Sequence, residues 1–535
     1  EEGEEGEEGE EGEEFTHEDV AVSAMLLGSV TFVMGLLYLV NWSDDDIRRY
    51  TWIIISTTIS IFLAVLLFQG FNQVMLTFLK GTSERIICFV QFIHCIMYII
   101  AMQITIAVLS GAICERSEVN LDEEVWVVND ALRATNGAVV DVGQVRNPHG
   151  RRSNMLDEYG MEVPVMKSKM ELEARQRRMK CFARLLAHMA GFAAINAGGT
   201  MQQLETFRSS PGRCLVPAFV VTVLIFVVFS VFGAVRKQQQ EQARRAGRAG
   251  RRARLYNEEV FEAENDILSL ATSFLLVQAL RFGIGGVLPN EEGLEEPEGR
   301  HSNMSIYVLY GIGIFFAVIA IGLVTVKSRI KPVHEEEGEV SIGQRVVDIA
   351  LNAAGMSFAW CFLWSTRWVC FKNSTFQLPS IMGRVVMALM LSGLSCLAVF
   401  ALDTVDDAHK GTEDSKSGAQ AIQILVNSLS ILIGFSWEHA FDGGVAAVAS
   451  MSSHPETLKF FLGIAIAFLM TPMWRRHILT KEMSLQKLKE DREEANNGKV
   501  VGAQPHHHPG MLLQPTMPMQ QQYPPGYEPV QGVYR

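Results

Sequence analysis

The chain has 535 residues, of which 48% are hydrophobic, and a formal net charge of −13. A soluble protein of this length is expected to divide into several domains. Here the hydrophobic residues gather in long blocks, which is typical of a membrane protein. The acidic balance does not indicate a basic partner, because ten of the first fourteen residues are Glu. Such a tract cannot bury apolar surface, and we predict that residues 1–19 are disordered.

No motif in the chain indicates an enzyme. The chain contains neither GxSxG nor HExxH, and it lacks the phosphate-binding loop motif and the signature motifs of protein kinases. The eight cysteines lie within or beside apolar blocks and lack metal-site spacing. We therefore predict no catalysis, no cofactor, no metal site and no nucleic-acid partner. The chain begins at Glu rather than Met, and we expect a fragment or processed form, so the sequence does not tell whether there is a targeting signal.

Eleven segments are long enough to cross a bilayer, for which about 20 residues suffice. Seven are strongly apolar: 20–40, 51–71, 86–113, 214–235, 305–326, 382–402 and 457–474. Four are more polar: 181–203, 266–288, 346–371 and 420–442. Residues 20–114 thus hold three spans, 115–180 form a cytoplasmic loop, and 181–477 hold eight. The segment 181–203 is the weakest because Arg184 and His188 interrupt it, and a re-entrant segment is the alternative.

The charges of the loops predict the orientation. The loop 236–254 has eight basic residues and one acidic residue, which places it in the cytoplasm by the positive-inside rule. The acidic stretch 291–300 then lies on the opposite side. With eleven spans, the N-terminus lies outside and the C-terminus in the cytoplasm. The sequence does not indicate which membrane holds the protein.

The spans after the first one pair into five hairpins, and the first helix of a hairpin is usually the more polar one. Three of these first helices share a faint pattern: DILSLA at 266–271, DIALNA at 348–353 and QILVNS at 423–428. Internal duplication is common in transporter folds. The alternative is that small and polar residues only allow close helix packing. We predict an all-α polytopic membrane protein with one lead helix and five weakly repeated helix hairpins.

Ionisable residues at the ends of the polar spans are the candidate functional groups. Charges at membrane depth cost about 2.5–3.5 kcal/mol each, and they persist where they pair or meet water. The predicted path or gate residues are Asp266, Arg281, Asp348, Arg367, Glu438, His439 and Asp442. We expect the two arginines to face Glu438 and Asp442, and the other two aspartates to face Arg184 and His188. In the alternative interpretation these groups are solvated at helix ends or lock the bundle.

The predicted function is a transporter or channel for an ion or small polar solute. The alternative is a membrane scaffold or receptor that acts through its cytoplasmic loop and tails. Residues 478–535 are predicted to form a cytoplasmic helix followed by a disordered tail rich in Pro and Gln. Within the tail, Pro524, Pro525 and Tyr527 match the PPxY pattern that WW domains bind. The loop 236–254 is a candidate site for anionic lipids.

Overall fold

The computed structural model describes residues 17–112, 163–245, 251–295, 301–329, 342–372, 380–409 and 415–501. The described residues form helices, turns and short loops, and no strand occurs among them. Contacts divide the chain into Glu1–Gln486 and Lys487–Arg535. The described part of the second unit is the end of one helix. The arrangement below concerns the first unit alone.

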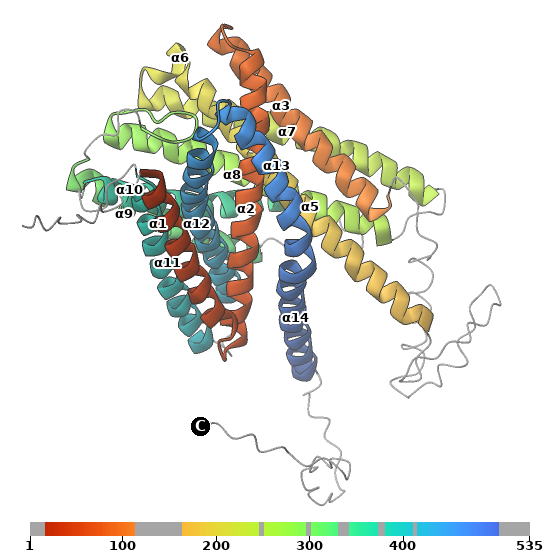
Figure 1. The fold of residues 1–535 in the computed structure, drawn as a ribbon. Coiled ribbons are helices and arrows are strands. Elements are labelled where there is room, and N and C mark those ends of the chain that lie inside the picture. Colours follow the sequence, from red (N-terminus) through yellow and green to blue (C-terminus); the bar gives the residue numbers. More distant parts are fainter. Residues whose placement is uncertain are drawn as a thin grey trace, which may run out of the picture. The chain divides into compact units, whose positions relative to one another are not determined.

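Where the residues between two helices are described, the connection is short (Figure 1). They are α1 (His17–Val40), α2 (Asp45–Phe78), α3 (Glu84–Ser110), α5 (Val163–Gln203), α6 (Glu205–Arg208), α7 (Pro211–Arg245), α8 (Arg251–Gly285), α9 (Asn303–Arg329), α10 (Ile342–Lys372), α11 (Ile381–His409), α12 (Ser415–Ser450), α13 (Pro455–Met473), the π-helix η3 (Trp474–Ile478) and α14 (Leu479–Val501).

Ten of the described helices are long and apolar enough to cross a membrane. This confirms an all-α, multi-pass membrane protein in which α1 precedes five helix hairpins. The eleventh predicted span, 181–203, forms the last part of α5 and is almost entirely buried. It is not among the ten, because Arg184, His188 and several small residues make it too polar. It is therefore enclosed by other helices rather than exposed to lipid.

The first helices of the hairpins pack side by side in a closed arrangement. Helix α2 contacts α5, α5 contacts α8, α8 contacts α10, α10 contacts α12, and α12 returns to α2. We call these five described helices the inner ring. In their most apolar stretches, 67% of the residues of α2 and α8 and 61% of those of α10 and α12 are buried. Protein contacts on most sides explain why these helices tolerate polar residues.

The second helix of each hairpin covers the inner ring. Helix α3 packs on α5, α7 on α8, α9 on α10, α11 on α12 and α13 on α2, so each contacts the first helix of the next hairpin. Only 17% to 39% of their most apolar stretches is buried. Large apolar side chains such as Phe315 and Phe468 are exposed, as expected for surfaces that meet lipid. Figure 1 shows α1, α11, α12 and α2 side by side, which agrees with their contacts.

Local chemistry fixes several helix ends. Asp44 begins α2, because its carboxylate accepts hydrogen bonds from the backbone N–H groups of Asp46 and Ile47. Gly111 ends α3 with a φ of +77°, a conformation that favours glycine. Pro472 precedes the π-helix η3, where the regular α-helical pattern of backbone hydrogen bonds is interrupted. The η3 residue Trp474 donates a hydrogen bond from Nε1 to Ser56 Oγ of α2 at 2.9 Å.

Candidate functional site

Aromatic side chains from each helix of the inner ring meet in its interior. They are Phe68 of α2, Phe192 of α5, Phe274 of α8, Trp360 of α10 and Phe435 of α12, and we call them the aromatic layer. All of them are buried. Their ring centroids lie 6.5 Å apart for Phe68 and Phe192, 5.4 Å for Phe192 and Phe435, 4.3 Å for Phe435 and Trp360, and 5.0 Å for Trp360 and Phe274. Such distances are those of ordinary aromatic packing.

The contact between Phe192 and Phe435 locates the aromatic layer. Helices α5 and α12 are not neighbours in the inner ring, because α2 stands between them on one side and α8 and α10 on the other. A contact between their side chains must therefore cross the interior of the ring. The aromatic layer thus fills the centre of the ring, at the depth of these two side chains.

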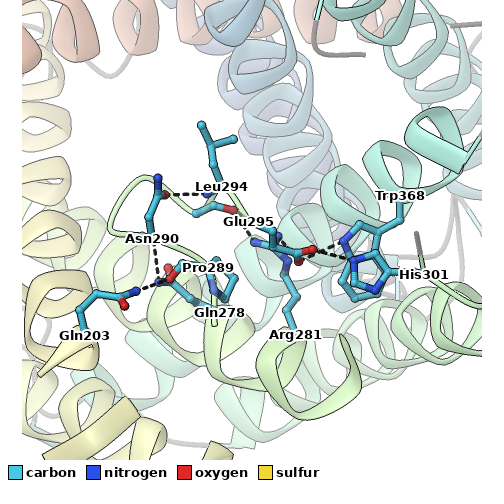
Figure 2. Close-up of polar contacts among 10 residues, drawn as sticks. Gln203, Gln278, Arg281, Pro289, Asn290, Leu294, Glu295, His301 and Trp368 are labelled. Atoms are coloured by element: carbon cyan, nitrogen blue, oxygen red, sulfur yellow. Dashed lines mark hydrogen bonds and ion pairs between the residues drawn. The ribbon is translucent and has the colours of Figure 1, made fainter. Parts of the chain in front are cut away.

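A buried ion pair joins α8 to the segment that follows it (Figure 2). It lies at the end of α8 that is predicted to be outside. Arg281 of α8 donates from Nη2 to Glu295 Oε1 at 2.8 Å, and its side chain is only 1% exposed. His301 Nε2 lies 2.6 Å from Glu295 Oε2, and Trp368 Nε1 donates to Oε1 at 3.1 Å. The His301 ring stacks on Trp368 with centroids 3.8 Å apart. The Glu295 carboxylate is therefore fully coordinated by protein groups.

The segment that carries Glu295 is wedged between the helices. We call residues 286–295, which follow α8, the outer loop. The side-chain amides of Gln278 and Gln203 donate to the Pro289 carbonyl at 3.0 Å and 2.5 Å (Figure 2). A Cβ on Gly293 would lie 2.7 Å from Trp364 and 2.8 Å from Phe274. The outer loop therefore joins α5, α8 and α10, and one of its glycines packs directly above the aromatic layer.

Glu438 and His439 follow Phe435 by three and four residues on α12, and so they share its face of the helix. The His439 ring lies 6.0 Å from that of Trp364, and its Nδ1 lies 3.9 Å from Glu438 Oε2. Trp437 points the other way, because it stacks on Phe32 of α1 and donates to Ser392 of α11. The two ionisable groups thus lie between the aromatic layer and the outer loop.

Polar groups also lie on the opposite side of the aromatic layer. Ser60 Oγ and His188 Nδ1 are 2.9 Å apart, and His188 precedes Phe192 by one helical turn. Farther from the layer, Arg184 makes two ion-pair contacts with Glu482 of α14, at 2.9 Å from Nη1 and 2.7 Å from Nη2. Asp266 of α8 lies within electrostatic reach of Arg184. The aromatic layer therefore separates two polar regions.

Three predicted partnerships are wrong. Arg281 binds Glu295 rather than Glu438 or Asp442. Asp442 instead pairs with Lys459 of α13 at 2.6 Å. Asp348 pairs with Lys327 of α9 at 2.7 Å rather than with the α5 side chains. In each case a loop or an outer helix provides a nearer opposite charge than the far side of the inner ring.

Arg367 is buried and lies within electrostatic reach of His439 and Arg281. Arg281 binds the outer loop, and His439 lies between this loop and the aromatic layer, so Arg367 lies at the predicted end of the ring.

Sequence reasoning missed a second buried charge cluster. Glu264 of α8 is 0% exposed. Its carboxylate accepts from Arg236 at 2.6 Å and 3.1 Å, from Arg345 at 2.7 Å and from Gln103 at 2.7 Å. The cluster joins α3, α7, α8 and α10. In the sequence, the available indication of this cluster is Glu264 itself, an acidic residue two positions before Asp266.

The predicted partner sites lie partly outside the described residues. Pro524, Pro525 and Tyr527 lie outside the described residues. Arg236, the first residue of the predicted lipid-binding segment 236–254, is bound to Glu264. Near the start of α2, Asp44, Asp46 and Asp403 bring one carboxylate oxygen each within 4.8 Å of one another. Asp44 caps α2 and Asp46 pairs with Arg49 at 3.1 Å, so both already have structural roles.

Comparison with known proteins adds no relative. The chain matches no protein-family model, no curated protein and no solved structure. Its function is therefore inferred from the geometry of the inner ring.

Proposed function

We propose that the protein is a transporter or channel for an ion or a small polar solute, with its path along the axis of the inner ring. The observation that carries the proposal is the aromatic layer, which crosses the ring between two polar regions. Apolar constrictions close pores by excluding water. In this interpretation the structure is a closed state, in which the aromatic layer is the gate.

The surroundings of the aromatic layer fit this role. On one side, Glu438 and His439 offer groups that can replace part of a solute's hydration shell, and on the other side His188 does so. The outer loop closes the outer end, and the contact of Arg184 with Glu482 closes the inner end. Burial of ionisable groups beside the aromatic layer is costly, and stability of the bundle alone does not account for it.

The gate interpretation predicts a leak when the aromatic layer is thinned. We expect Phe435→Ala to raise ion flux into proteoliposomes by roughly tenfold, the change that about 1.4 kcal/mol of gate stability produces. The matched control is Phe468→Ala on α13, whose side chain is 83% exposed, and it should leave flux unchanged. Equal flux in both variants would place the path elsewhere. If the wild type and Phe435→Ala show no flux of any ion tested, the scaffold or receptor interpretation gains support.

We also propose that the N-terminus lies outside and the C-terminus in the cytoplasm, on the basis of the loop charges. Single cysteines in the exposed turns test this on a background without native cysteines. Thr82→Cys, between α2 and α3, should react with a membrane-impermeant maleimide on intact cells. Asn41→Cys, between α1 and α2, should react only after permeabilisation. The reverse pattern would invert the topology.

A further inference from the structure

Glu438 lies where a solute moving through the inner ring would have to pass. It follows Phe435 by one turn, and Phe435 contacts Phe192 across the interior. Glu292 of the outer loop also lies within electrostatic reach of Glu438, although α8 and α12 are not neighbours in the ring. The carboxylate is thus enclosed by the aromatic layer on one side and the outer loop on the other.

The Glu438 carboxylate is buried without a hydrogen-bond donor among the described residues. Its residue is 5% exposed, and within the described part of the chain it makes no hydrogen bond. His439 Nδ1 lies 3.9 Å from Glu438 Oε2, beyond hydrogen-bond distance. The neighbouring cations are engaged elsewhere, because Lys459 pairs with Asp442 at 2.6 Å and Arg384 donates to the His439 carbonyl at 3.3 Å. This contrasts with Glu295 and Glu264, whose oxygens are fully coordinated by protein donors.

The charges around Glu438 favour a cation at this position. Asp442 on the same helix and Glu292 of the outer loop add negative potential, while Lys459 of α13 and Arg384 of α11 oppose it. Arg367 of α10 lies within electrostatic reach of the adjacent His439. A metal cation needs several oxygen ligands, as the six to eight of Ca²⁺ illustrate. A single carboxylate beside an imidazole is instead sufficient to bind one proton.

We propose that Glu438 is a proton-binding site and that protons are the transported or coupled ion. The inference rests on the proposed path through the inner ring. His439 is the adjacent acceptor on the same side of the aromatic layer. On the other side, His188 beside Ser60 is the next group that can accept a proton. Movement of the aromatic layer would join the two sides through water, so that a proton leaves Glu438 toward His188.

Infrared difference spectroscopy of the full chain in lipid nanodiscs tests the site without any transport assay. A step in pH should reveal the carbonyl stretch of a protonated carboxylic acid. We expect Glu438→Gln to remove this band, and Glu438→Asp to shift it. Glu205→Gln is the matched control, because Glu205 is 87% exposed and should leave the band unchanged. A band that persists unshifted in both Glu438 variants would overturn the proposal.

Proton flux provides a second readout. Proteoliposomes that contain a pH-sensitive dye should acidify under an imposed potential, and Glu438→Gln should reduce the rate to that of protein-free liposomes. Retained proton flux in this variant would overturn the proposal. Flux of another ion that depends on Phe435 but not on Glu438 would also overturn it, while leaving the proposed function intact. A band at Glu438 without flux of any ion would support the site and refute the transport path instead.

Discussion

Replacing Glu264 with glutamine is expected to lower the free energy of unfolding by about 3–5 kcal/mol, the usual cost of removing one partner from a buried ion pair. The Glu264 carboxylate is fully buried and accepts hydrogen bonds from both Arg236 and Arg345. An amide keeps the shape but carries no charge, so two guanidinium groups lose their counterion. Unfolding in SDS titrations of the purified protein measures the effect.

Two further variants make this test specific. Glu262→Gln changes the same residue type on the same helix. The Glu262 side chain is 54% exposed and lies 3.9 Å from Lys180, so we expect a change within about 1 kcal/mol, as for an exposed ion pair. Arg345→Met removes one of the two cations. Combined with Glu264→Gln, it should destabilise by less than the sum of the single changes, because fewer charges remain uncompensated. A strictly additive double variant would show that the cluster does not act as a unit.

The division into inner and outer helices could be predicted from polarity for four of the five hairpins, whereas the strongly apolar span 51–71 lies in the inner helix α2. Spans such as 266–288 and 420–442 carry Ser, Asn, Gln and charged residues, and they form the inner helices α8 and α12. Strongly apolar spans such as 305–326 and 457–474 form the outer helices α9 and α13. The reason is physical: lipid accepts only apolar side chains, whereas contacts between helices also accommodate small and polar ones.

The partners of individual charges could not be predicted in the same way. Hydropathy gives the depth of a residue in the membrane but not its direction around the helix axis. Arg281 and Glu438 are predicted at similar depth and therefore as partners. Helix α8, which carries Arg281, is followed by a loop with its own acidic residues, and the helix α13 beside α12 provides Lys459. The acidic stretch 291–300 has the composition of a solvated loop. Only the fold shows that Glu295 is buried against Arg281.

The aromatic layer also escaped prediction for a physical reason. Phe and Trp are common throughout membrane helices, so Phe192 or Phe435 alone carries no signal. The distinctive property is that these side chains contact one another from helices that are not neighbours. Such a contact depends on tertiary packing, which a single sequence without a recognised relative does not encode in any local pattern.

Removal of the ion pair that holds the outer loop is also expected to have a large effect on the stability of this loop. Glu295→Gln leaves Arg281 buried without its counterion, and we expect a cost of about 3–5 kcal/mol. The loop lies at the end of the inner ring, so the cost should appear as local opening of residues 286–295 rather than as global unfolding. Hydrogen–deuterium exchange in nanodiscs should show lost protection in this segment, with α2 and α12 unchanged.

Two glycines of the outer loop separate its packing from its backbone conformation. Gly286 and Gly293 have similar φ values, +75° and +84°, which alanine adopts at a cost of about 1–2 kcal/mol. A Cβ on Gly286 would meet open space, whereas on Gly293 it would overlap Trp364 and Phe274. Gly293→Ala should therefore raise exchange in the loop far more than Gly286→Ala. Equal effects would show that the loop is not wedged above the aromatic layer, and the outer closure proposed for the path would then have to lie elsewhere.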